Sequence, residues 1–351
     1  AGRVRAVNGS HPRLEELLAP VSRPEKVRVN LLALGDVGST LLLGLRLMGG
    51  DVISSIGICD LREGVARRWE FELNQIQLPG PYDALPPVEI VPPERLFDGD
   101  VFLFCASRFV PDTAVKTGDV RMAQYQLNRE LAALYARKAR EARYRGLFCV
   151  VSDPVDPLCR AVLTESNRAP GGGMDYQGLL TCQVRGFGLG VMHARALYYA
   201  RRDPRFASYL TEGRAFGPHG EDLVLANSIA HYDDALSREL TEKVAHANLD
   251  MRRLGYKPYV APALSSGALT LLALAALPSL RTLAFCPQGS CSLPDEALPL
   301  ASAPLTESGL TELQRNGNFL LWFCSGLAIL VSFAILIQAV LEICRGGRKR
   351  R

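Results

Sequence analysis

Several features that would mark a particular class of protein are missing from this sequence. Aromatic residues make up only 7% of its 351 residues, and no run of lysine and arginine is interleaved with them. Nucleic-acid-binding proteins often carry a basic stripe of that kind, so we expect no nucleic-acid partner. The net charge is +4, which is ordinary for a globular protein, and part of the excess lies in the tail at residues 345–351.

A metal-ligand cluster and a regular cysteine framework are also missing. The nine cysteines are an odd number, and only Cys286 and Cys291 form a close pair. A zinc site would need two further ligands, which the neighbouring sequence does not supply, so we expect no metal. The pattern indicates a reduced, cytoplasmic compartment, with a disulfide between Cys286 and Cys291 as the alternative.

The two ends of the chain differ in character. Residues 1–26 are polar and lack the apolar core of a signal peptide. In contrast, residues 319–341 are 23 positions without a charge, enough at about 1.5 Å rise per residue to cross a bilayer. Trp322 near one end and the basic tail at the other favour a membrane helix. A buried helix or an oligomer contact is the alternative.

The most regular pattern lies between Val27 and Asp60. An apolar run leads into the turn Gly35-Asp36-Val37-Gly38, an aliphatic helical pattern follows, and a second apolar run ends on Asp60. This order predicts a strand, a turn, a helix and a second strand of a parallel sheet. Gly35 leaves room for a pyrophosphate, Gly38 allows close packing of helix and strand, and the helix N-terminus offers N–H groups to phosphates.

Asp60 and Ala33 qualify this interpretation. The Asp60 carboxylate can accept hydrogen bonds from a ribose diol and would repel a 2′-phosphate, which favours NAD over NADP. Ala33 occupies the first position of the fingerprint G-x-G-x-x-G, so only two of its three glycines are present. A glycine turn that binds nothing is therefore the alternative.

The order of predicted elements indicates an α/β fold. Strands and helices alternate up to about Val155, with strands at 88–91, 101–105 and 147–151 and a helix over 120–143. We predict a Rossmann-type doubly wound parallel sheet, then an α+β substrate domain with helices over 192–201, 227–254 and 267–277, and a C-terminal hydrophobic helix. The expected divisions are an extension (1–26), a dinucleotide-binding domain (27–155), a substrate domain (156–316), a membrane helix (317–344) and a basic tail (345–351).

His219 is the strongest candidate for proton transfer. It lies between Gly217-Pro218 and Gly220, with Glu221 and Asp222 after it. The glycines allow a sharp turn that would push the imidazole into a cleft, and the pKa of histidine suits proton transfer near neutrality. A structural or merely exposed histidine is the alternative that this segment alone leaves open.

Taken together, the run from Val27 to about Leu277 resembles the lactate/malate dehydrogenase family. The glycine turn with Asp60 looks like its NAD site, Ser152-Asp153-Pro154-Val155-Asp156 resembles its S-N-P-V-D segment, and Gly217–Gly220 its G-x-H-G catalytic turn. Ala194-Arg195 resembles the end of its L-D-x-x-R helix, Asp119-Val120-Arg121 lies where its mobile loop carries an arginine, and Ser265-Ser266-Gly267 resembles its S/T-x-x-A/G stretch.

The resemblance implies an NAD-dependent dehydrogenase that acts on a small 2-hydroxy or 2-oxo acid and forms a homo-oligomer, a dimer or a tetramer. His219 would donate and accept the proton, Arg121 would polarise the carbonyl, and Arg195 would grip the substrate carboxylate. The implied site residues are Asp153 beside the substrate, Arg108 and Ser266 in the substrate pocket, and Gly35, Asp36, Val37, Gly38, Asp60 and Ser107 around the cofactor.

The sequence departs from the family pattern in three places. Met192 stands where the acid that orients the histidine is expected, Asp153 replaces the asparagine of S-N-P-V-D, and the loop from Arg108 to Arg121 is longer than the family's usual lid. We expect Asp153 to compensate by hydrogen-bonding His219 or the substrate hydroxyl. Arg108 favours a malate-like dicarboxylate, although a one-residue shift would place Phe109 there and suit an apolar side chain.

Two functional classes therefore remain. The first is the dehydrogenase, and the second is a catalytically weak NAD-binding sensor or scaffold of the same fold, which Met192 would allow. For either, we expect membrane attachment through residues 319–341 with the enzyme domain in the cytoplasm. That topology sends the basic tail across the bilayer, against the positive-inside tendency, so a helix lying in the membrane interface is the alternative.

Overall fold

The computed structural model describes residues 10–15, 24–77, 85–108, 120–218, 222–256 and 261–272. The predicted C-terminal helix at 317–344 and the basic tail lie outside these ranges. Within them, no helix combines the length and the apolar character needed to cross a membrane.

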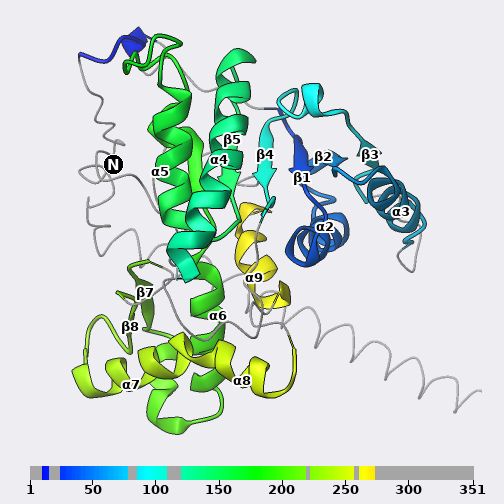
Figure 1. The fold of residues 1–351 in the computed structure, drawn as a ribbon. Helices are drawn as coiled ribbons and strands as arrows, with labels where there is room; N and C mark the ends of the chain where they lie inside the picture. The colour runs from blue at the N-terminus through cyan, green and yellow to red at the C-terminus, as the bar shows by residue number, and fades with distance from the viewer. Residues whose placement is uncertain are drawn as a thin grey trace, which may run out of the picture. The chain divides into compact units, whose positions relative to one another are not determined.

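The centre of the fold is a six-stranded sheet in which every pairing is parallel (Figure 1). Its order is β3-β2-β1-β4-β5-β6, so the winding direction reverses between β1 and β4. The predicted doubly wound sheet is confirmed. The strands are β1 (Val27–Leu32), β2 (Ile53–Cys59), β3 (Val88–Ile90), β4 (Val101–Phe104), β5 (Leu147–Val150) and β6 (Val184–Gly186).

Both faces of the sheet are buried, which explains why its strands are continuous apolar runs. Successive side chains of a strand point to opposite faces. In β4, Val101 and Leu103 therefore join one core while Phe102 and Phe104 join the other. The first core includes α2 (Asp36–Met48) and α3 (Glu63–Asn74), and the second is covered by α4 (Val120–Glu141) and α5 (Val155–Ser166).

The chain after β6 forms helices and one antiparallel hairpin. Its elements are α6 (Leu189–Ala200), β7 (Arg214–Phe216), β8 (Val224–Ala226), α7 (Asp234–Ala245), α8 (Ala247–Arg253) and α9 (Ala261–Ala268); short 3-10 turns lie at Pro93–Arg95, Thr181–Gln183 and Pro204–Leu210. The parallel sheet thus continues past residue 155, where the dinucleotide-binding domain was predicted to end. The sequence did not indicate this because the three-residue β6 is too short to recognise.

The single helix predicted over 227–254 is wrong in detail. The chain is still a strand until Ala226, and α7 begins only after Asp233, whose carboxylate accepts a hydrogen bond from the Leu236 N–H at 3.0 Å. Aspartate at such a position satisfies an N–H group that has no partner within the helix. A second break at His246 then separates α7 from α8.

Helix α9 packs directly against α6 through two glycines. A Cβ added to Gly190 of α6 would lie 2.5 Å from the Cα of Gly267, so the backbones touch without intervening side chains. Ser265 of α9 also donates a hydrogen bond to the Val37 carbonyl at 3.1 Å. Helix α9 therefore connects α6 with the first turn of α2.

Candidate cofactor and substrate site

The glycine turn between β1 and α2 combines one open and one closed position. Apart from its two neighbours in the chain, no described residue lies within 4 Å of a Cβ built on Gly35, whereas a Cβ on Gly38 would lie 2.0 Å from the Ala33 carbonyl oxygen and 3.3 Å from the Cβ of Cys105. Gly38 is therefore required for packing. The backbone at Gly35 faces open space at the N-terminus of α2, where N–H groups and the helix dipole favour an anion.

Ala33 has the backbone conformation of a glycine. Its φ is +74°, in the left-handed region that disfavours a residue with a Cβ. Its N–H donates to the Cys59 carbonyl at 2.8 Å, which links the turn to the end of β2. The fingerprint geometry thus persists although its first glycine is absent.

Asp60 supports this turn from the end of β2. Its Oδ2 accepts a hydrogen bond from the Leu34 N–H at 2.8 Å and its Oδ1 from the Arg62 N–H at 2.9 Å, while its side chain is 8% exposed. Because each carboxylate oxygen has two lone pairs, both atoms keep the capacity to accept a further hydrogen bond. Asp60 therefore shapes the turn, and a ribose hydroxyl remains compatible with it.

Arg195 is the most unusual charged residue in the described part of the chain. It is 9% exposed on α6, its Nη1 lies 3.7 Å from the Met192 Sδ, and its Nε has no hydrogen-bond partner among the described residues. Burial lowers the pKa of the guanidinium, and the negative charge of Asp153 opposes that shift. A buried cation with an unused donor provides a site for an anionic group.

Asp153 lies just beyond β5, where the chain makes the cis peptide bond Asp153–Pro154 before α5 begins. The preceding Ser152 donates its hydroxyl hydrogen to the Ala106 carbonyl at 2.6 Å, which joins this segment to the one after β4. The carboxyl ends of β4 and β5 therefore lie together, at the edge of a parallel sheet where ligands usually bind.

Ser107 and Arg108 follow β4 at the same edge. The Ser107 hydroxyl contacts Asn128, with 3.3 Å between its Oγ and the Asn128 Oδ1. The guanidinium of Arg108 is half-exposed and pairs with Glu130 of α4 at 3.2 Å. A substrate carboxylate bound by Arg108 would therefore have to replace Glu130 as its partner.

The remaining predicted residues are placed unevenly. His219 lies outside the described residues, as do Phe109 and the pair Cys286 and Cys291. Arg121 lies in the first turn of α4, but its side chain is outside the described part. Ser266 is exposed and its hydroxyl donates to the Ala263 carbonyl of its own helix.

Sequence reasoning missed Asn128 at this edge, and within the segment Ser265-Ser266-Gly267 it selected Ser266. The hydroxyl of the neighbouring Ser265 is the one that is buried and reaches the glycine turn. Asn128 is 0% exposed and lies on the buried face of α4, in register with Ala132 and Tyr135. A single polar residue on an otherwise apolar helix face is the signal that could have identified it.

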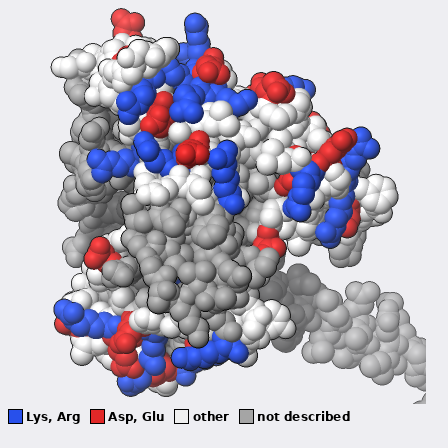
Figure 2. Space-filling view, viewed as in Figure 1, with Lys and Arg blue, Asp and Glu red and all other residues white. Residues whose placement is uncertain are grey.

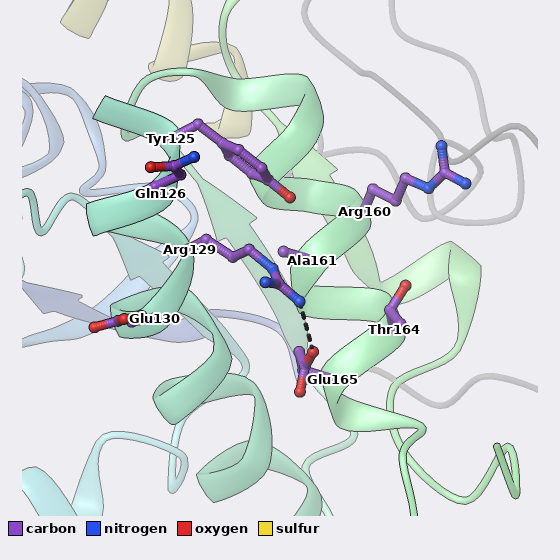
Figure 3. Close-up of a pocket in the computed structure, with 8 residues that line it drawn as sticks. All are labelled: Tyr125, Gln126, Arg129, Glu130, Arg160, Ala161, Thr164 and Glu165. Carbon is purple, nitrogen blue, oxygen red and sulfur yellow. Dashed lines mark hydrogen bonds and ion pairs between the residues drawn. The ribbon is translucent and has the colours of Figure 1, made fainter. Parts of the chain in front are cut away.

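A pocket of about 610 Å³ opens between α4 and α5, on the side of these two helices that faces away from the sheet (Figure 3). Glu165 lies at one end of it and forms ion pairs with Arg129 (3.3 Å), Arg137 (3.4 Å) and Arg168 (3.7 Å). The pocket is lined by Tyr125, Gln126, Arg129, Glu130, Arg160, Ala161, Thr164 and Glu165, and none of the predicted site residues is among them.

Charges of both signs share the visible surface. On the face shown in Figure 2, Lys and Arg alternate with Asp and Glu over α4 and α5.

Within the described ranges, no group of His, Cys, Asp and Glu is arranged to hold a metal ion, and five cysteines there are free thiols.

Solved structures with a similar fold include lactate and malate dehydrogenases. The minor L-lactate dehydrogenase from Enterococcus mundtii, solved in a ligand-bound form, aligns with a TM-score of 0.55 at 18% identity over 71% of this chain and 77% of that one. Malate dehydrogenase from Plasmodium falciparum aligns with a TM-score of 0.52 at 14% identity over 70% of this chain and 76% of that one. The Archaeoglobus fulgidus malate dehydrogenase, solved with NADH, gives 0.51 at 19% identity over 70% and 77%.

No family model and no curated protein sequence matches the chain. The likeness therefore rests on the arrangement of the sheet and its helices, at identities of 14–19% in these three structures. The chain has the fold of the lactate and malate dehydrogenases.

Proposed function

We propose that this chain is an NAD-dependent dehydrogenase of a small 2-hydroxy or 2-oxo acid. The observation that carries the proposal is the buried guanidinium of Arg195, whose Nε is unpaired among the described residues. A buried cation is costly when one of its donors has no acceptor, and the Met192 thioether and the nearby charge of Asp153 still leave the Nε unpaired among the described residues. A substrate carboxylate would supply the missing acceptor and would be held in a defined orientation by the planar guanidinium.

The residues at the glycine turn fit the cofactor. The open space at Gly35, the N-terminus of α2 and the remaining acceptor capacity of Asp60 suit a pyrophosphate and a ribose diol. Ser107 follows β4 at the same edge of the sheet. NAD, when bound, supplies the hydride chemistry, and the acid at position 60 disfavours the additional phosphate of NADP.

The other roles follow from the resemblance and remain proposals. His219 would hold the proton that moves to and from the substrate oxygen, and Arg121 would stabilise the negative charge that develops on that oxygen. Asp153, close enough to influence the charge of Arg195, would accept a hydrogen bond from His219 or from the substrate hydroxyl. Arg108 would pair with a second carboxylate, which favours a malate-like substrate over a lactate-like one.

The test is oxidation of NADH by the purified full chain with pyruvate, oxaloacetate and longer 2-oxo acids, followed by absorbance. We expect turnover with at least one acid, and a lower KM for oxaloacetate than for pyruvate. His219→Gln should lower kcat strongly, whereas His246→Gln, at an exposed position, should leave kcat unchanged. An absence of turnover with every acid contradicts the dehydrogenase assignment.

A catalytically weak NAD-binding sensor or scaffold is the second candidate, and Met192 favours it. Its thioether occupies the contact with Arg195, and a thioether can neither orient a histidine nor stabilise an imidazolium. Binding of NADH without turnover on any acid would support this candidate. Absence of NADH binding would exclude both candidates.

Membrane attachment through residues 319–341, a cytoplasmic enzyme domain and a homodimer or homotetramer are further proposals. The uncharged length of that segment and the basic tail after it support the first. Flotation of the full chain with anionic vesicles, compared with a chain ending at residue 316, tests it. Equal recovery of both chains in the unbound fraction would contradict membrane attachment. Light scattering of the purified chain would give the oligomer size.

A further inference from the structure

The buried amide of Asn128 lies where two strands of the sheet stop pairing. The ladder between β4 and β5 ends with backbone hydrogen bonds from the Val151 and Ser152 N–H groups to the Phe104 carbonyl. Beyond it, the hydroxyl of Ser152 reaches the Ala106 carbonyl. The next connection between these two segments is the side chain of Asn128, from α4.

Asn128 bridges the two segments with well-formed hydrogen bonds. Its Oδ1 accepts from the Arg108 backbone N–H at 2.9 Å, and its Nδ2 donates to the Asp153 carbonyl at 2.8 Å. Because an N–H group can only donate and a carbonyl can only accept, these two contacts determine which way the amide points. The Ser107 hydroxyl lies beside both amide atoms, at 3.2 and 3.3 Å.

A carboxamide suits this position because it carries the same donor and acceptor as a peptide group. It can therefore continue the pairing between strands that have moved too far apart to bond directly. The amide is completely buried, in surroundings where water does not compete and where an unpaired polar group would be costly. Asn128 thus sets the separation between the backbones of Arg108 and Asp153.

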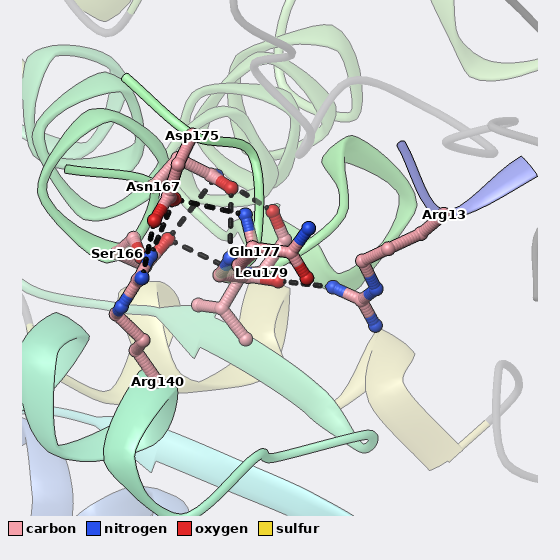
Figure 4. Close-up of polar contacts among 8 residues, drawn as sticks. Arg13, Arg140, Ser166, Asn167, Asp175, Gln177 and Leu179 are labelled. Atoms are coloured by element: carbon pink, nitrogen blue, oxygen red, sulfur yellow. Dashed lines mark hydrogen bonds and ion pairs between the residues drawn. The ribbon is translucent and has the colours of Figure 1, made fainter. Parts of the chain in front are cut away.

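Asn167 provides an internal comparison away from the candidate site. It is also buried, donates to the Leu163 and Leu179 carbonyls at 2.9 and 2.8 Å, and accepts from the Gly178 N–H at 2.9 Å (Figure 4). Both asparagines use the side-chain amide to pair backbone N–H and carbonyl groups. They differ in what they hold, because only Asn128 holds residues assigned to substrate.

We propose that Asn128 is a positioning residue for the substrate site. It keeps the segment that bears Arg108 and the segment that bears Asp153 in register, so that both meet one substrate at the carboxyl edge of the sheet. This inference rests on the proposed dehydrogenase function. It adds a residue that contacts neither substrate nor cofactor and acts through the backbones of two residues that do.

The test compares Asn128→Asp with Asn167→Asp in the full chain. Each change replaces a buried NH₂ donor by an oxygen that faces a backbone carbonyl, so both should lower the midpoint of urea unfolding to a similar extent. Asn128→Asp should also lower kcat/KM for the preferred 2-oxo acid by roughly 10- to 100-fold, since small misplacements of reacting groups have effects of that size. Asn167→Asp should retain wild-type kcat and KM.

A second measurement tests the bridge independently of activity. Asn128→Asp keeps the oxygen that accepts from the Arg108 N–H, whereas Asn128→Leu removes it. Hydrogen exchange at the Arg108 amide should therefore stay slow in the aspartate variant and become fast in the leucine variant, with exchange at Gly178 unchanged in both. Unchanged exchange at Arg108 in Asn128→Leu would show that the bridge does not exist.

The outcomes separate this inference from the proposed function. If the wild-type chain oxidises NADH and the two aspartate variants lose kcat/KM equally, Asn128 is only structural and the inference fails alone. If the wild-type chain oxidises NADH with none of the acids, the dehydrogenase function fails and this inference fails with it. A selective loss in Asn128→Asp supports both.

Discussion

At the scale of single residues, Ala33 indicates that the glycine turn depends on backbone conformation more than on a sequence fingerprint. The turn places residue 33 at φ +74°, a conformation that costs a non-glycine residue about 1–2 kcal/mol. The rest of the turn, including the close approach of Gly38 to the Ala33 carbonyl, retains the geometry that a glycine would adopt without strain.

Ala33→Gly should therefore raise the free energy of unfolding, by up to about 1 kcal/mol after the greater flexibility of glycine in the unfolded chain is counted. Urea unfolding at neutral pH measures the change. Ala235→Gly, at an exposed position in α7, is the control and should lower stability by up to about 1 kcal/mol. Equal losses in the two variants would contradict a strained Ala33.

The role proposed for Arg195 would place function in conflict with stability. Arg195→Met would remove a buried charge that has an unused donor and should raise the free energy of unfolding by roughly 1 kcal/mol or more, while abolishing turnover because the carboxylate loses its partner. Thermal unfolding and NADH oxidation measure the two effects. Arg201→Met, at an exposed position after α6, should change neither, and a less stable Arg195→Met would indicate that the guanidinium is already satisfied in the fold.

At the scale of elements, the contact between α6 and α9 determines where Arg195 lies. Helix α6 carries Arg195, and α9 carries the hydroxyl of Ser265 that reaches the glycine turn. The backbones meet at Gly190 and Gly267, so any added side chain would push Arg195 away from the glycine turn. Small residues are therefore required where these two helices cross.

Gly190→Ala should lower the free energy of unfolding by about 1–3 kcal/mol, the usual cost of overpacking a core, although alanine favours helix formation. The control is Gly64→Ala in the first turn of α3, where nothing outside the helix itself lies within 4 Å of the new Cβ among the described residues and stability should rise by up to about 1 kcal/mol. Urea unfolding should therefore show a lower free energy of unfolding for Gly190→Ala and a higher one for Gly64→Ala, if α6 and α9 are as close as the structure has them. A stabilised Gly190→Ala would contradict it.

The loop after α5 is stabilised by an ion pair that acid should weaken. Arg140 binds Asp175 through both of its terminal nitrogens, at 2.7 and 2.5 Å, and also donates to the Ser166 carbonyl (Figure 4). Arg13 donates to the Gly178 carbonyl, which connects the short N-terminal segment to this loop. The Arg140 guanidinium lowers the pKa of Asp175 to about 2.

An acid with a lowered pKa in the folded state stabilises the fold above its ordinary pKa and loses that effect as the pH falls through the lowered value. The stability difference between wild type and Asp175→Asn should therefore be full at neutral pH and shrink as the pH falls from about 4 towards 2. Urea unfolding across this range measures it, with Asn at the exposed Asp51 as the control. A difference that does not vary with pH would contradict the ion pair.

At the scale of the whole molecule, a cofactor that binds only the folded chain must stabilise it. NADH at about 100 times its Kd should raise the free energy of unfolding by about 2.7 kcal/mol, which a thermal shift series over NADH concentration detects. NADPH at the same concentrations should have a smaller effect if Asp60 binds the ribose diol as proposed, because its carboxylate would repel the 2′-phosphate. Equal effects of the two nucleotides would contradict the role of Asp60.

Much of the fold was predictable because its signals are local. The apolar runs that became β1, β2, β4 and β5 are nearly continuous because both faces of the sheet are buried, and the spacing of Gly35 and Gly38 reports a turn formed by adjacent residues. The break between α7 and α8, the strand β8 and the short β6 were not predictable from periodicity. Each is shorter than a pattern needs to be, and each depends on pairing or capping contacts.

The sequence by itself determined the doubly wound parallel sheet and the glycine turn, since these follow from side-chain periodicity and from the sterics of neighbouring residues. Only the tertiary structure decided that Arg195 is buried with an unused donor, that Met192 lies against it, and that Asn128 bridges Arg108 and Asp153. The physical reason is that burial and hydrogen-bond partners arise when distant segments meet, as Asn128 and Asp153 do across 25 positions of sequence.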